Sequence, residues 1–189
     1  YYRGEGAGGD IKATVGLPFE DDPRVLRRSL SILKDWVPES NRPERVLELF
    51  AGVGVYTSYL HRVSNRVDAV TTPAHALDDL HANFASVSTD EVQRAYASIS
   101  RGLGYAFRKK DRYDLVCAWV PIRGAVGLWR TLKDVDAPRL ITSHASLDKA
   151  AADLRRIVEL GYECEGLHAM APEPHRGRVS LLARWTQKR

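Results

Sequence analysis

The feature that most constrains the fold is a glycine turn between an apolar segment and a helix-like segment. Residues 45–50 read Arg-Val-Leu-Glu-Leu-Phe, and Ala51-Gly52-Val53-Gly54 follows before a second apolar stretch begins at Val55. Only small residues let a ligand approach the backbone at such a turn, and the helix beyond it offers unpaired N–H groups. In a doubly wound fold the turn lies at the carboxyl end of the first strand, where ligands bind. The pattern favours a nucleotide-type pocket, with tight packing of helix on strand as the alternative reason for the glycines.

Strand-like and helix-like segments alternate along the rest of the chain. Strands are predicted at 45–50, 66–70, 92–97, 113–120 and 139–143, and helices at 22–37, 55–61, 73–84, 125–132 and 146–160. Two last strands, at 163–170 and 179–185, flank a Pro-rich segment and are predicted to pair antiparallel. This order predicts an α/β, Rossmann-like fold with helices on both faces of a mostly parallel, seven-stranded sheet.

Length and composition fit one domain. The chain has 189 residues, of which 44% are apolar, and no apolar run is long enough to span a bilayer. We assign residues 19–189 to this domain and the Gly-rich residues 1–18 to an arm, or the end of an upstream region, with little structure. Because the first residue is Tyr1 and not Met, we expect the chain to be processed or partial. The net charge of +4 permits an acidic partner such as RNA but is weak support for one.

The two cysteines predict structural thiols. Cys117 and Cys164 each lie in an apolar run, which is typical of buried cysteines. No Cys or His pair has the spacing of metal ligands, so we expect no metal site, no disulfide framework and a reducing, intracellular environment.

Five segments carry motifs in a characteristic order. Residues 46–54 resemble the pattern V-L-D-L-F-x-G-V-G, and residues 19–23 resemble F-x-Q-V-N-P. Residues 120–124 stand where D-P-P-R-x-G is expected, residues 142–162 resemble S-C-N-P with a long helix ending in G-Y, and residues 170–175 resemble M-F-P-Q-T-H. Together they resemble the catalytic domain of the RNA uracil-5 methyltransferases, which make 5-methyluridine in tRNA and rRNA with S-adenosylmethionine. The resemblance implies a class I methyltransferase fold.

The positions that carry this family's chemistry are substituted. Its reaction needs a cysteine thiolate that adds to C6 of uracil, and the matching position is His144 or Ala145. Its base for the C5 proton corresponds to Gly177 or Arg178, and its loop acid corresponds to Val120. Three losses together predict a catalytically degenerate member that no longer methylates uracil C5. His144 has two open interpretations, a general base in some other chemistry or a structural histidine.

The cofactor contacts are only partly retained. Thr71 stands where the family has the acid that binds the ribose hydroxyls, and Asp68 lies two residues before Val70, the end of the predicted strand. Ser98 stands where the family has the acid near the adenine. A hydrogen bond to a charged group contributes about 1.5–3 kcal/mol, so the loss at Thr71 weakens binding roughly tenfold to hundredfold. We therefore expect no bound cofactor, or S-adenosylmethionine if any. The vestigial positions of the turn are Glu48, Phe50, Ala51, Gly52 and Gly54.

Basic side chains supply candidate RNA contacts. The strongest cluster interleaves with the aromatic residues Tyr105 and Phe107 and comprises Arg108, Lys109, Lys110 and Arg112. Further candidates are Arg123 in the loop, a possible phosphate contact, and His175 with Arg176 near the end. Each has an ordinary alternative as a solvated helix end or loop.

Three functional hypotheses follow. The first is a pseudo-methyltransferase that binds RNA or a ribonucleoprotein, such as a ribosome assembly intermediate, with other proteins of a large complex. The second is an active S-adenosylmethionine-dependent RNA methyltransferase whose target is not uracil C5. The third is a supporting subunit of a heteromeric methyltransferase. A mitochondrial matrix location would fit a basic chain without an initiating Met, and no membrane partner is expected.

Overall fold

The fold is taken from a computed structural model. It describes residues 4–6, 9–11, 23–71, 74–84, 112–121, 125, 128–173 and 178–188.

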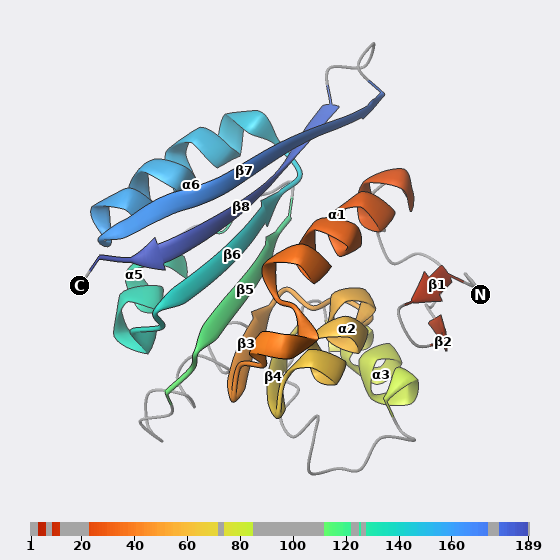
Figure 1. The fold of residues 1–189 in the computed structure, drawn as a ribbon. Coiled ribbons are helices and arrows are strands. Elements are labelled where there is room, and N and C mark those ends of the chain that lie inside the picture. The colour runs from red at the N-terminus through yellow and green to blue at the C-terminus, as the bar shows by residue number, and fades with distance from the viewer. Residues whose placement is uncertain are drawn as a thin grey trace.

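A six-stranded mixed sheet forms the centre of the molecule (Figure 1). Its strands are β3 (Arg45–Leu49), β4 (Arg66–Val70), β5 (Leu115–Val120), β6 (Arg139–His144), β7 (Tyr162–Glu173) and β8 (Arg178–Gln187), in the order β4-β3-β5-β6-β8-β7. The strands β3 to β6 pair parallel, whereas β8 is antiparallel to both β6 and β7. The α/β fold with its closing antiparallel pair is therefore confirmed. The seventh strand that we predicted at 92–97 lies outside the described residues.

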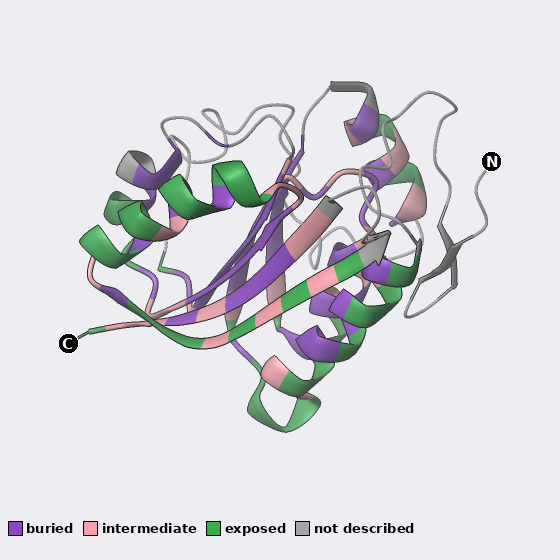
Figure 2. Ribbon diagram, turned by 90° about the horizontal axis from the view of Figure 1, so that it is seen from above, coloured by how far each residue is buried: buried purple, intermediate pink, exposed green. Residues whose placement is uncertain are grey.

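Helices cover both faces of the sheet. One face carries α1 (Pro23–Trp36), α2 (Val55–Val63) and α3 (Ala74–Asn83), and the other carries α5 (Leu128–Leu132) and α6 (Leu147–Glu159). Two 3-10 turns, η1 (Glu39–Asn41) and η2 (Lys133–Val135), connect these elements. Figure 2 shows the result, with buried strands between helices whose outer faces are exposed.

The strand sequences explain why two apolar layers form. In β3, Val46 packs with α1 and α2, while Leu47 and Leu49 pack with α5 and α6, because successive side chains point to opposite faces. All six residues of β5 are buried. A central parallel strand is covered on both faces and therefore reads as an uninterrupted apolar run.

The amino-terminal arm contains more structure than we predicted. Strand β1 (Gly4–Gly6) pairs antiparallel with β2 (Gly9–Ile11), and β1 lies against α2. The prediction of little structure over residues 1–18 is therefore wrong for these two segments. The ladder is formed by backbone groups, so a Gly-rich sequence without apolar periodicity does not reveal it.

Candidate functional site

The glycine turn is held by the ends of two neighbouring strands. The backbone N–H of Ala51 donates to the carbonyl of Val70 at 3.0 Å, which ties the turn after β3 to the end of β4. Phe50 adopts a φ of 61° and Gly52 a φ of 58°, so the chain reverses within a few residues. A Cβ added to Gly52 would meet no atom of the described residues within 4 Å. Among these residues, the turn therefore presents an open backbone surface at the carboxyl ends of β3 and β4.

The second glycine of the turn serves packing. Gly54 has a φ of 96°, and a Cβ there would lie 2.4 Å from Phe84 Cε2 and 2.7 Å from Leu80 Cδ1. Both side chains pack against the turn from α3 and the residue after it. The two explanations for the glycines thus divide between positions: Gly54 is needed for close packing, whereas Gly52 borders open space.

The carboxylate of Glu48, on β3, is enclosed by other side chains of the protein. Glu48 is fully buried at the penultimate position of β3. Its Oε2 accepts from the Thr57 hydroxyl at 2.6 Å, and its Oε1 accepts from the Trp119 indole at 2.7 Å. Tyr56 stacks on Trp119 with ring centroids 4.1 Å apart. Burial raises the pKa of Glu48 from 4.5 to about 7, because the two hydrogen bonds offset only part of the lost solvation.

Among the described residues, a threonine stands at the end of β4. Thr71 is fully buried, and its hydroxyl donates to the carbonyl oxygen of Gly52 at 3.0 Å. Its one donor is thus committed to the glycine turn.

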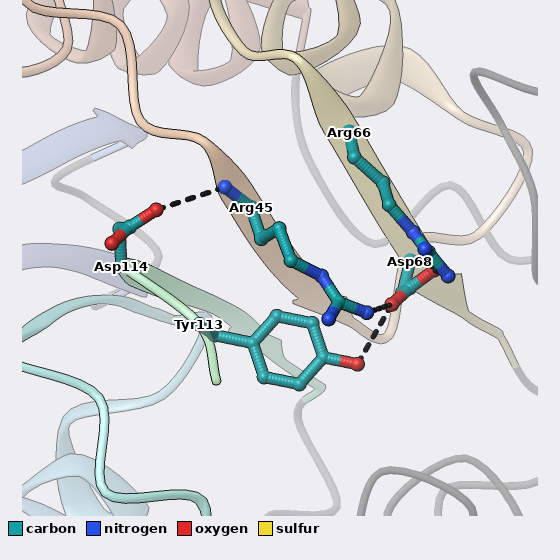
Figure 3. Close-up of polar contacts among 5 residues, drawn as sticks. All are labelled: Arg45, Arg66, Asp68, Tyr113 and Asp114. Carbon is teal, nitrogen blue, oxygen red and sulfur yellow. Dashed lines mark hydrogen bonds and ion pairs between the residues drawn. The ribbon is translucent and has the colours of Figure 1, made fainter. Parts of the chain in front are cut away.

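Asp68, the middle residue of β4, binds other partners within the chain. Its carboxylate accepts from Arg45 Nη2 at 3.2 Å, from Arg66 Nη2 at 3.1 Å and from the Tyr113 hydroxyl at 2.7 Å (Figure 3). The side chain is only 2% exposed. Asp68 therefore cannot replace the missing acid beside the glycine turn.

The nucleophile position holds a buried histidine. His144 is the last residue of β6 and lies beneath α5 and α6, with 1% of its surface exposed. Its Nε2 lies 3.6 Å from Oδ2 of Asp153, too far for a hydrogen bond, and its ring centroid lies 6.2 Å from that of Trp129. Burial lowers the pKa of His144, and Asp153 opposes the effect only in part. Ala145 follows and carries no reactive group.

Neither cysteine takes over the nucleophile's task. Cys117 is fully buried in β5, and its burial, followed by the nearby Glu48, raises the pKa of the thiol well above its ordinary value. A protonated, enclosed thiol is inert. Cys164 is exposed on β7, so the prediction that both cysteines are buried is wrong for Cys164. It lies on β7, the edge strand of the sheet.

The other predicted positions are scattered. Val120 is buried at the end of β5, and Arg178 begins β8. Arg112 is exposed just before β5. The remaining candidates lie outside the described residues: Ser98, Arg108, Lys109, Lys110, Arg123, His175, Arg176 and Gly177.

Two further site classes find no support within the described ranges. Among these residues, no three His, Cys, Asp or Glu side chains are grouped to hold a metal ion. The described helices are also too short or too polar to cross a membrane.

The sequence did not reveal how Glu48 is enclosed. Thr57 and Trp119 reach its two oxygens from α2 and β5, and neither residue is marked by a motif in the sequence. Asp153 likewise reads as the polar side of a helix, yet it is buried against β6. The Trp119 contact depends on β3 and β5 being neighbours in the sheet, a property that no local pattern encodes.

Comparison with solved structures identifies the fold. The N-methyltransferase NodS from Bradyrhizobium japonicum WM9, solved with S-adenosylhomocysteine, matches with a TM-score of 0.75 at 14% identity, over 95% of each chain. Magnesium protoporphyrin IX methyltransferase from Synechocystis PCC 6803, with bound S-adenosylmethionine, matches with a TM-score of 0.69 at 16% identity, over 94% of this chain and 86% of the other.

A tRNA (uracil-54, C5)-methyltransferase from Pyrococcus abyssi is also similar, with a TM-score of 0.69 at 17% identity. The match covers 90% of this chain but 40% of the Pyrococcus enzyme, so the chain spans less than half of that protein. At the level of sequence, no family model and no curated protein matches. The chain therefore has the Rossmann-like fold of S-adenosylmethionine-dependent methyltransferases.

Proposed function

We propose that this chain is a pseudo-methyltransferase, a catalytically degenerate relative of the RNA uracil-5 methyltransferases that binds RNA or a ribonucleoprotein. In this role it acts as an assembly factor of the ribosomal kind, together with other proteins of a large complex. We place it inside the cell, with the mitochondrial matrix as its compartment.

One observation carries the proposal. The polar side chains at the carboxyl ends of β3 and β4 are committed to partners within the chain: Glu48 to Thr57 and Trp119, and Thr71 to Gly52. A ligand would have to displace these hydrogen bonds, and each buried group left unsatisfied costs about 1–3 kcal/mol. With a buried histidine at the nucleophile position, the fold retains its shape without the groups for uracil C5 methylation.

A second candidate is an active methyltransferase with another acceptor. The open backbone surface at Gly52 favours it, since a side chain added at that glycine would meet no atom of the described residues. An amine or hydroxyl acceptor needs no cysteine nucleophile. A third candidate, a supporting subunit in a heteromeric methyltransferase, requires a partner that supplies the missing thiol and acids.

Calorimetric titration with S-adenosylmethionine and S-adenosylhomocysteine separates these candidates. The pseudo-methyltransferase predicts no binding at millimolar cofactor. Micromolar binding would instead support an active enzyme. In that case Gly52→Val should abolish the heat of cofactor binding, and the control Leu167→Ala should leave it unchanged. Val fills the space above the turn, whereas Leu167 is exposed on β7, outside the turn. Thermal unfolding of both variants confirms that each is folded.

A further inference from the structure

Helix α6 carries a line of apolar side chains beside the one that it buries. Its side toward the sheet buries Ala150, Asp153 and Ile157. Four other apolar residues follow one another at steps of four, three and four positions, so they lie in one line along a neighbouring side of the helix. These residues, which we call the α6 seam, are Leu147, Ala151, Leu154 and Val158. Leu147 is 45% exposed and Val158 57%, so both ends of the seam are open to solvent.

The seam faces the edge strand of the sheet. Helix α6 contacts β7 and lies beside it (Figure 1). Val158, at the end of the seam, borders a hollow in the surface together with the exposed Cys164 of β7. The residues that line this hollow are Val158, Gly161, Tyr162, Glu163, Cys164 and Lys188. The seam is therefore reached from the β7 edge of the molecule.

The seam has the spacing of a coiled-coil contact. Steps that alternate between three and four residues are those of positions a and d in the seven-residue repeat abcdefg. Leu147 and Leu154 occupy d, and Ala151 and Val158 occupy a. At 1.5 Å per residue, the 13 residues of α6 are about 20 Å long. A second helix with the same spacing and length fits such a seam, and α6 of another copy of the chain has both.

The charges beside the seam match a second α6 that runs in the opposite direction. Asp148 and Arg155 are exposed and occupy position e in successive repeats. In an antiparallel pair of helices the e positions face each other, so Asp148 of each copy lies opposite Arg155 of the other. In a parallel pair, the seven residues between them would keep the opposite charges about 10 Å apart along the axis. The charge pattern thus favours the antiparallel arrangement.

The other charges of α6 and its surroundings leave this pairing undisturbed. Lys149 and Arg156 lie on the opposite side of the helix, where Arg156 pairs with Asp153 at 4.0 Å. Glu159 occupies position b, away from the seam. At the end of the seam, the carboxylate of Glu163 is paired with Lys188.

We propose that the chain forms a homodimer in which the seams of two α6 helices pack antiparallel. Both copies use the same surface, as in a two-fold symmetric interface. Burial of the apolar seam drives the association, and the two reciprocal pairs of Asp148 with Arg155 fix its direction. A contact between two helices of about 20 Å is smaller than the standard stable interface, so the dimer is weak, with a dissociation constant in the micromolar range. Dimerisation goes beyond the proposed function and does not depend on RNA.

Sedimentation equilibrium at protein concentrations from about 10 μM to 1 mM tests the dimer. The mass of the wild type should rise from that of a monomer toward that of a dimer over this range. Ala151→Glu should remove the rise, because it places a carboxylate from each copy in the middle of the apolar contact. Ala151 is exposed, so the substitution disturbs no core packing. Lys149→Glu, at an exposed position on the opposite side of α6, is the matched control and should leave the rise unchanged.

An exchange of charges tests the direction of the helices. Asp148→Arg and Arg155→Asp should each weaken the dimer by about tenfold or more, because each change turns both attractive pairs into repulsive ones. An equimolar mixture of the two variants should associate again, since the arginines of one then face the aspartates of the other. A loss of folding cannot produce this recovery, because mixing changes neither chain.

Three results would overturn the inference. A monomer mass for the wild type at every concentration would show that the seam binds no second copy. Undiminished association in Ala151→Glu would place the dimer contact on another surface. A mixture of Asp148→Arg and Arg155→Asp that stays monomeric, although each variant alone is weakened, would refute the antiparallel pairing.

Discussion

Glu48→Gln tests whether the acid beside the glycine turn is a neutral structural group. Glutamine has nearly the same shape, so its carbonyl oxygen can still accept from Trp119. Its amide can donate to the Thr57 hydroxyl, which then acts as the acceptor instead of the donor. The substitution therefore removes the titrating proton and keeps both contacts.

The expected effect follows from the pKa of Glu48. It is 4.5 in the unfolded chain and about 7 in the folded one, so between these values the folded state holds a proton that the unfolded state has lost. The stability of the wild type therefore falls as the pH rises from 4.5 to 7 and levels off above 7. At about 1.36 kcal/mol per pKa unit, the full difference is about 3 kcal/mol. Glu48→Gln should match the wild type near pH 4.5 and exceed it by up to this amount at pH 8.

Urea unfolding followed by tryptophan fluorescence measures this difference at several pH values. Subtracting the wild-type free energy of unfolding from that of the variant cancels the other titrating groups. Glu159→Gln, which removes an exposed carboxyl of α6, is the control and should give a difference that does not rise with pH. A Glu48→Gln difference that is equally flat from pH 5 to pH 8 would refute the neutral, enclosed carboxyl.

Three further predictions concern stability and reactivity. Gly54→Ala should destabilise the chain by about 1–3 kcal/mol, because its Cβ would overpack the core. Gly52→Ala should destabilise it by about 1 kcal/mol, because of its positive φ alone. Equal losses of stability in chemical unfolding would contradict this division of roles between the two glycines. The pKa of His144 is lowered from 6.5 in the folded state, so the stability of the wild type should decline as the pH falls below 6.5. Chemical unfolding at pH 5 and pH 7.5 should show that His144→Phe removes this decline. An equal loss of stability at pH 5 in the wild type and the variant would contradict the prediction. A thiol reagent should modify Cys164 in the native protein and Cys117 only after unfolding, and two fast-reacting thiols would show that β5 is accessible.

Local patterns predicted the fold where each element carries its own signal. The glycine turn follows an apolar strand and precedes a helix, so its place at the carboxyl edge followed from chain order alone. The helix over 125–132 was predicted too long, since α5 begins only at Leu128, while α2 continues to Val63 beyond the predicted 61. The strand β7 was predicted to end at 170 but continues to Glu173, because Ala169 and Ala171 are too small to mark an alternation.

The site was less predictable because its contacts join distant segments. The indole of Trp119 reaches Glu48 across 71 residues, and no spacing rule connects a tryptophan in one strand with an acid in another. Cys164 illustrates the converse error. An apolar run predicts burial, but an edge strand leaves alternate side chains in solvent, and the position of a strand in the sheet is a property of the whole fold.

The helix α1 forms its main contacts at the other end of the chain, which has a consequence for synthesis. Trp36 lies against β7 so closely that a Cβ on Gly166 would be 3.1 Å from its ring, and the Ser29 hydroxyl reaches the Met170 sulfur across 141 residues. Translation adds about 5–20 residues per second, so roughly 7–30 s pass between the synthesis of α1 and that of β7. During this time the apolar side of α1 lacks its partner. A nascent or truncated chain that lacks β7 would therefore expose that side, and chaperones or premature aggregation would compete for it.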